Sequence, residues 1–167
     1  MNGQARKLYE YHVWANDRVL RRLGELPGEA AETKVQSVFP SIVEGLVHLY
    51  ASDWYWLRAL RGMPHDQIVK PRPAFAGDTA EKRLAELAEL YATLPSEYRA
   101  ELNKLDAAAT TRIGDRSGGG LETTYLDIVQ HVVNHGTYHR GHIGAMLRQL
   151  GHAGVKLDYT FYLGSIK

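Results

Sequence analysis

The sequence predicts an all-α protein built as a four-helix bundle. Four segments carry apolar residues at intervals of three and four, which is the spacing of an amphipathic helix. Glycine and proline separate these segments, as is typical of the ends of helices. The chain has 167 residues, 44% of them hydrophobic, which suits one domain with its own core. We therefore expect a single domain over residues 1–167 in which four long helices pack together.

The first two helices are expected in the first 64 residues. The first runs over Ala5–Leu26 and ends at Pro27-Gly28, where the apolar periodicity stops. The second should begin near Pro40, because the missing N–H of proline costs nothing in the first helical turn. It should end at Gly62-Met63-Pro64, before a polar loop. Apolar residues lie almost all round this second segment, which predicts that it is the central helix.

The third helix is expected from about Thr79 to Leu105, and an irregular segment follows it. Pro95 lies inside the helical pattern, so it either kinks one helix or separates two, and the pattern alone leaves both open. Residues 107–123 contain β-branched residues on both sides of Gly118-Gly119-Gly120. This segment is expected to form a short hairpin or a long loop between the third and fourth helices.

The fourth helix has the clearest boundary signals. Thr124 and Asp127 have the spacing of a capping box, which satisfies the free N–H groups of a helix start. The helix should extend to Leu150, where Gly151 can take the left-handed conformation that ends helices. The tail over Leu157–Leu163 is aromatic and is expected to pack as a short last turn.

The composition excludes several classes of function. The 20 Lys and Arg residues balance 19 Asp and Glu residues, without the basic excess of a protein that binds phosphates, so neither nucleic acid nor a membrane surface is expected as a partner. There is no cysteine, which excludes disulfides, thiolate metal ligands and a cysteine nucleophile. No apolar run resembles a signal sequence or a membrane span, so a cytoplasmic protein is expected.

Histidine is concentrated in the fourth helix. Four of the eight histidines fall within twelve residues, and they are His131, His135, His139 and His142. At ~100° per residue they share one face of the helix, and two imidazoles one turn apart can bind one ion. His131 and His139 lie about 12 Å apart along the axis and cannot both bind it. Spacing alone leaves three pairs open, namely His131/His135, His135/His139 and His139/His142.

A third ligand has to come from another helix, and His48 is the candidate. It lies in the second helix beside Ser41, Gly45 and Ser52, whose small side chains leave room for a site. The alternative is a patch that gains charge near pH ~6.5. Several cations on one face would repel one another, whereas a metal ion holds imidazoles neutral.

Other residues near the cluster are given ordinary roles. His12, His65 and His152 are expected to be solvated or hydrogen-bonded histidines. Gly136, Gly141 and Gly144 each cost about 0.5–1 kcal/mol inside a helix. These glycines therefore indicate either close helix packing or room for a ligand.

Three stretches of the sequence resemble the signatures of the DinB family, whose members are DinB/YfiT-like metalloproteins. The similarity extends over nearly the whole chain. The stretches are NHGTYHRGHI at 134–143, followed by LRQLG at 147–151 and Asp158; SIVEGLVHLYASDW at 41–54; and YHVWAN at 11–16.

The resemblance implies a fold and a site that spacing did not show. The fold would be a four-helix bundle with up-down-down-up connectivity, often as a homodimer. The metal ligands would be His48, His135 and His139, with His131 and His142 as their neighbours. Many members carry Gln where this chain has His142. Related branches use low-molecular-weight thiols such as bacillithiol, mycothiol or glutathione.

A divalent metal ion on three neutral imidazoles keeps an open coordination position, which is the catalytic pattern for zinc. Imidazole suits Zn²⁺ and Ni²⁺, our first expectations, and also Fe²⁺ and Cu²⁺. The sequence therefore predicts a metal-dependent enzyme that activates a thiol or water for a small-molecule substrate, as a thiol S-transferase or a hydrolase. Alternatives are a non-catalytic metal-binding or structural dimer and a histidine pH sensor.

No catalytic acid or base is assigned from the sequence. Tyr55, Tyr138 and Asn134 lie near the proposed ligands in the sequence. The two tyrosines are expected to pack in the core.

Overall fold

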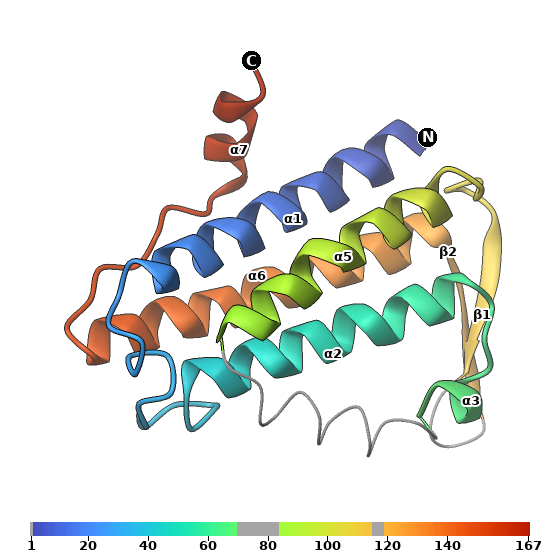
Figure 1. Cartoon of the computed structure of the whole chain (residues 1–167). Coiled ribbons are helices and arrows are strands. Elements are labelled where there is room, and N and C mark those ends of the chain that lie inside the picture. The colour runs from blue at the N-terminus through green and yellow to red at the C-terminus, as the bar shows by residue number, and fades with distance from the viewer. Residues whose placement is uncertain (1, 70–83, 115–118) are drawn as a thin grey trace.

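The computed structural model describes residues 2–69, 84–114 and 119–167, which are mostly helical (Figure 1). No helix in these ranges is long and apolar enough to cross a bilayer. The elements are α1 (Asn2–Gly24), α2 (Ile42–Leu60), α3 (His65–Val69), α5 (Leu84–Leu102), β1 (Thr110–Gly114), β2 (Gly120–Thr124), α6 (Tyr125–Gln149) and α7 (Tyr159–Ser165).

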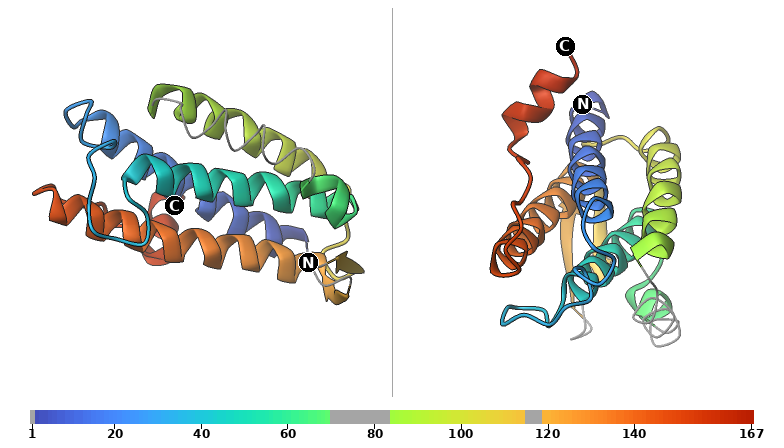
Figure 2. Two further views of the ribbon diagram at one scale, coloured as in Figure 1. Left: turned by 90° about the horizontal axis from the view of Figure 1, so that it is seen from below. Right: turned by 60° about the vertical axis from the view of Figure 1, so that its left-hand side comes forward.

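The four long helices α1, α2, α5 and α6 lie side by side (Figures 1 and 2). Helix α6 packs against both α1 and α2, and α5 packs against the same two helices. In Figure 1, α1 and α6 run in one direction while α2 and α5 run in the other. The seam between α2 and α6 and the seam between α1 and α5 therefore lie on different sides of the helix cluster.

Helix α2 begins two residues later than predicted. Ser41 is its N-cap, and the Ser41 side chain accepts a hydrogen bond from the Glu44 N–H. Pro40 therefore precedes the cap instead of occupying the first turn. Serine is favoured at the N-cap position because its hydroxyl accepts a hydrogen bond from a free N–H of the first turn, which proline cannot do. Helix α2 is largely buried, as its nearly continuous apolar surface predicted.

The third long helix, α5, passes through Pro95 without a break, so the alternative of two separate helices is wrong. It ends at Leu102, three residues before the predicted Leu105, and its predicted start at Thr79 lies outside the described residues. The short helix α3 was not predicted, because its polar sequence after Pro64 has no apolar periodicity. Five residues are too few for a periodic signal.

The segment between α5 and α6 forms a hairpin, which decides between the two predicted alternatives. Strands β1 and β2 pair antiparallel, from Thr110 opposite Thr124 to Gly114 opposite Gly120. Thr124 then caps α6, and the capping box with Asp127 is present as predicted. Hydrogen bonds from Thr124 lower the pKa of the Asp127 carboxyl.

The C-terminal end of α6 and the tail also follow the prediction. Gly151, with φ of 81°, ends α6 in the left-handed region, where a side chain would be strained. The tail forms α7, slightly beyond the expected 157–163, and packs against α1. The Tyr11 hydroxyl donates to the Leu157 carbonyl at 2.8 Å, which ties the tail to α1.

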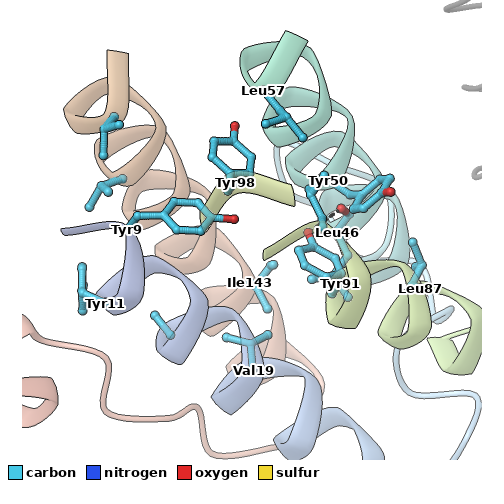
Figure 3. Packing of buried hydrophobic residues seen from close by; sticks show 14 of the residues in the cluster. Tyr9, Tyr11, Val19, Leu46, Tyr50, Leu57, Leu87, Tyr91, Tyr98 and Ile143 are labelled. Atoms are coloured by element: carbon cyan, nitrogen blue, oxygen red, sulfur yellow. Dashed lines mark hydrogen bonds between the residues drawn. The ribbon is translucent and has the colours of Figure 1, made fainter. Parts of the chain in front are cut away.

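The core contains several tyrosines as well as aliphatic residues (Figure 3). Tyr9 from α1 stacks on Tyr98 from α5, with ring centroids 4.3 Å apart. The Tyr98 hydroxyl donates to the Asp53 carbonyl at 2.6 Å, and the Tyr91 hydroxyl donates to the Leu46 carbonyl at 2.9 Å. These bonds satisfy phenol groups that would otherwise be costly to bury, and they join α5 to α2.

A buried polar network crosses the centre of the molecule. His12 and Asn16 from α1, Asp53 from α2 and Arg140 from α6 are each at most 6% exposed. His12 Nε2 lies 2.8 Å from Asp53 Oδ2, and Arg140 Nη1 lies 3.2 Å from His12 Nδ1. Arg140 also donates to Asn16 Oδ1 at 2.7 Å. One anion and one cation are thus buried together and linked through a histidine.

Gly136 is what allows α1 and α6 to approach at this network. A Cβ built at position 136 would collide with the His12 ring and would lie 2.6 Å from Arg140 Nη1. Close packing, one of the two roles expected for the helix glycines, therefore applies to Gly136. It does not apply to Gly141, where an added Cβ would meet no described atom within 4 Å outside its own helix.

The substitutions Gly136→Ala and Gly141→Ala are expected to have opposite effects on the free energy of unfolding. Gly136→Ala should lower it by about 1–3 kcal/mol, because the new methyl group overpacks a rigid buried contact. Gly141→Ala should raise it by about 0.5–1 kcal/mol, because alanine favours the helix and nothing obstructs it. Urea unfolding of both variants measures the difference, and a Gly136→Ala variant as stable as Gly141→Ala would contradict the packing role.

Candidate metal centre

Three histidines converge between α2 and α6. His48 projects from α2, and His135 and His139 project from successive turns of α6. His135 Nε2 lies 3.4 Å from His48 Nε2 and 3.1 Å from His139 Nε2. One ring nitrogen from each of the three residues can be chosen so that all lie within 4.8 Å of one another. The structure therefore brings together the three residues that the resemblance implied, and not His131 or His142.

These spacings suit a single metal ion. With Zn–N bonds of about 2.0–2.1 Å in tetrahedral geometry, neighbouring ligand nitrogens lie about 3.3–3.4 Å apart. Within the described part of the chain, no fourth His, Cys, Asp or Glu joins the group. Three imidazoles could thus hold an ion while the protein leaves a further coordination position to a small molecule.

The electrostatics keep two of the three imidazoles, His135 and His139, uncharged at pH 7. Burial lowers the pKa of His135 to about 4, and the neighbouring His48 imidazole acts in the same direction. Burial also lowers the pKa of His139 to about 4, with contributions from His135 and His48. Both rings are therefore neutral at pH 7, and a neutral imidazole is the form that binds a metal.

In most metal sites, the histidine ring nitrogen that does not bind the metal donates a hydrogen bond to a carboxylate or carbonyl. The Nδ1 atoms of this cluster differ in this respect. The Nδ1 atoms of His135, His139 and His142 are buried and meet no hydrogen-bond partner among the described residues. The convergence of the Nε2 atoms is therefore set by helix packing and by the rings that surround them, not by hydrogen bonds to these Nδ1 atoms.

Phe39 forms one wall of the site. Its ring lies 5.1 Å from the His48 ring and 5.4 Å from the His139 ring, between centroids. A Cβ built at Gly45 would lie 3.3 Å from Phe39, so glycine here makes room for this aromatic ring. The space that small residues beside His48 were expected to leave is thus filled by Phe39. The loop before α2 has no periodicity, and no sequence signal identified this residue.

His131 and His142 flank the triad along α6. The His131 ring lies 5.9 Å from the His135 ring and 4.6 Å from Trp56. The His142 ring lies 5.8 Å from the His139 ring, so both residues are neighbours of the cluster, as the resemblance implied.

The tyrosines near the ligands are not core residues. Tyr138 is 62% exposed, so the expected core position is wrong for it. Its ring lies 5.1 Å from the His139 ring and 4.4 Å from the His142 ring, between centroids. Tyr55 is half-buried and its hydroxyl lies 2.8 Å from His65 Nδ1, and Asn134 is exposed. Tyr138 therefore borders the cluster at His139, whereas the Tyr55 hydroxyl is engaged with His65.

The buried network is the part of the site region that sequence reasoning missed. His12 was expected to play an ordinary role, and Asp53 and Arg140 were not singled out. A signal existed, because Asn16 falls on the apolar stripe of its helix and Asp53 falls among buried positions of α2. A polar residue on an apolar face has to find a partner on another helix.

Fold and site together define a helical protein with a candidate three-histidine metal centre. Comparison with known proteins gives the family. The DinB family model matches residues 1–166. The chain is also 40% identical over 169 aligned residues to Protein DinB of Bacillus subtilis (strain 168), and the alignment covers 98% of this chain and 95% of that protein. The chain therefore belongs to the DinB family.

The lowered histidine pKa values predict a pH dependence of stability for metal-free protein. An unfolded histidine has a pKa of about 6.5, whereas His135 and His139 have values of about 4 in the folded state. Between these values the unfolded chain binds protons that the folded chain does not, so the free energy of unfolding falls as the pH is lowered from about 6.5 to about 4. Denaturant unfolding in the presence of a chelator measures this slope.

The double variant His135→Gln/His139→Gln is the control for this prediction. It lacks both imidazoles, so its stability should change less over the same pH range. A profile as steep as that of the parent protein would show that other groups cause the acid sensitivity.

Proposed function

We propose that this protein binds one divalent metal ion through His48, His135 and His139. The observation that carries the proposal is the convergence of the three imidazoles, with Nε2 atoms 3.1 and 3.4 Å apart. The lowered pKa of His135 and of His139 supports it, because neither ring has to lose a proton at pH 7 before it binds. Imidazole ligands favour Zn²⁺ or Ni²⁺, and they also suit Fe²⁺ and Cu²⁺.

The metal content of untagged protein tests this proposal. Parent protein should retain close to one ion per chain after dialysis, whereas His135→Ala should lose at least nine tenths of it, because two imidazoles bind weakly. His152→Ala is the matched control, since His152 lies beyond α6 and outside the cluster. Elemental analysis gives the result, and equal, negligible metal in parent and His135→Ala protein would contradict the site.

We further propose that the centre is catalytic and activates a low-molecular-weight thiol or a water molecule, most closely as a thiol S-transferase. A bound divalent ion would supply a Lewis acid that favours the deprotonated thiol. The chain has no cysteine, so the thiol has to come from outside it. In the reaction the thiol proton passes to solvent, the sulfur forms a bond to the electrophilic carbon, and the bond from that carbon to the leaving group breaks, with its electron pair departing on the leaving group.

Thiol transfer can be tested with a low-molecular-weight thiol and a chromogenic electrophile. Metal-loaded parent protein should accelerate conjugation, and His48→Ala should remove at least nine tenths of the enhancement, because it removes a ligand. His152→Ala should keep the parental rate. Acceleration that survives His48→Ala and chelation would reject a metal-dependent reaction.

A metal-binding protein without turnover is the second candidate. It is favoured by one observation, that no carboxylate in the described ranges joins the three histidines to transfer a proton. Metal retention without thiol conjugation or hydrolysis would support it over the enzyme.

We infer that the architecture is the four-helix bundle of the family with up-down-down-up connectivity. The directions of α1, α2, α5 and α6 in Figure 1 and their packing support this inference. The single domain over 1–167, the homodimer, the small-molecule substrate and the absence of nucleic-acid and membrane partners stay predictions.

A further inference from the structure

A second candidate binding site lies between α1 and α5, away from the three histidines. A cleft of about 720 Å³ is lined by residues of these two helices, by Asp53 of α2, and by Tyr162 and Ile166 at the C-terminal end. None of His48, His135 and His139 lines it. Its volume lies within the range of about 300–1,000 Å³ that is typical of small-molecule sites.

The buried network forms part of the cleft lining. His12 is 1% exposed and Asp53 is 2% exposed, and both line the cleft. Asp53 Oδ2 pairs with His12 Nε2 at 2.8 Å. Asp53 Oδ1 is buried and meets no hydrogen-bond donor among the described residues. An unpartnered carboxylate oxygen in this environment is costly and calls for a donor.

The contacts within the network show which Asp53 oxygen lacks a partner. His12 Nδ1 lies 3.2 Å from Arg140 Nη1, and His12 Nε2 lies 2.8 Å from Asp53 Oδ2 and 3.0 Å from Asn16 Nδ2. Arg140 also donates to Asn16 Oδ1, so its Nη1 is engaged with His12 and Asn16. Asp53 lines the cleft, and its Oδ1 is left without a donor among the described residues.

Aromatic side chains form part of the cleft walls. Tyr9, Trp14, Tyr91 and Tyr162 contribute aromatic surface.

Two ion pairs lie at the cleft. Arg99 donates to both oxygens of Glu10 at 2.7 and 2.8 Å, which lowers the pKa of the Glu10 carboxyl. Arg21 pairs with Asp17 at 2.9 Å. These two carboxylates already have partners, which leaves Asp53 as the lining acid with an unsatisfied oxygen in the described part of the chain.

We propose that this cleft binds a small organic ammonium ion, with its N–H donated to Asp53 Oδ1 and its apolar body against the aromatic walls. A carboxylate acceptor favours a charged donor over a neutral one, because charge-assisted hydrogen bonds are stronger. Aromatic faces also attract cations. A neutral alcohol of the same shape would gain the apolar contacts but only the weaker hydrogen bond.

Titration of the full chain with 2-phenylethylamine tests the proposal at pH 7, where the amine is protonated. Calorimetry gives the affinity, and the Trp14 indole N–H resonance reports on the cleft. The matched neutral and anionic probes are 2-phenylethanol and 3-phenylpropionate. We expect both to bind at least tenfold more weakly than the amine. Equal or tighter binding of the alcohol, or no binding of the amine at millimolar concentration, would overturn the proposal.

Two variants locate the binding. Ala92 lines the cleft and is exposed, so Ala92→Trp should fill the cleft and weaken amine binding at least tenfold without disturbing the core. Ala100→Trp is the matched control, because Ala100 is an exposed alanine of α5 that does not line the cleft. Amine affinity unchanged by Ala92→Trp would place binding elsewhere and reject the site.

Asp53→Asn tests the acceptor itself. It should weaken amine binding at least tenfold while alcohol binding changes little; should the variant not fold, the Ala92→Trp result still decides. Chelator treatment separates this site from the metal centre, because amine binding in the cleft should be the same with and without a chelator. Loss of amine binding on chelation would instead assign it to the three histidines and contradict the proposal.

Discussion

The structure depends on the buried connection from Arg140 through His12 to Asp53. Moving an arginine and an aspartate out of water costs several kcal/mol per charge, and the cost is offset only when the hydrogen bonds fit. Here the guanidinium is hydrogen-bonded to His12 and Asn16, and His12 links it to the carboxylate. The connection joins α1, α2 and α6 at one level of the molecule.

This network also sets the rotation of α6 and thereby the candidate metal centre. Gly136 and Arg140 face α1, because the His12 ring packs directly against them. His135 and His139 each precede one of these residues, about 100° round the helix, and that rotation directs them toward α2 and His48. Rotating α6 to break the network would also move both imidazoles away from His48.

Sequence periodicity predicted the long helices because a repeated apolar face is a local signal. The capping box and the helix end at Gly151 were also predicted, because they too depend on residues close together in the sequence. It could not predict where α2 begins, since that depends on whether Ser41 or Pro40 satisfies the helix start. In the site, spacing placed four histidines on one face but could not say which pair faces His48. That choice rests on the rotation of α6, which is set by polar contacts between helices distant in sequence. Only the family resemblance selected His135 and His139.

The cluster disfavours protons yet is suited to a single divalent ion, and the two properties have one cause. Burial and the neighbouring imidazoles lower the pKa of His135 to about 4, although the charge of Asp53 acts in the opposite direction. Each proton added to the cluster brings a separate positive charge close to the others, in a region with little water to screen it. One ion held by the three Nε2 atoms would use all three without this repulsion between rings, and the charge of Asp53, which already favours positive charge at His135, would act in the same direction. The packing that makes protonation costly is therefore the same packing that prepares the three nitrogens for a metal.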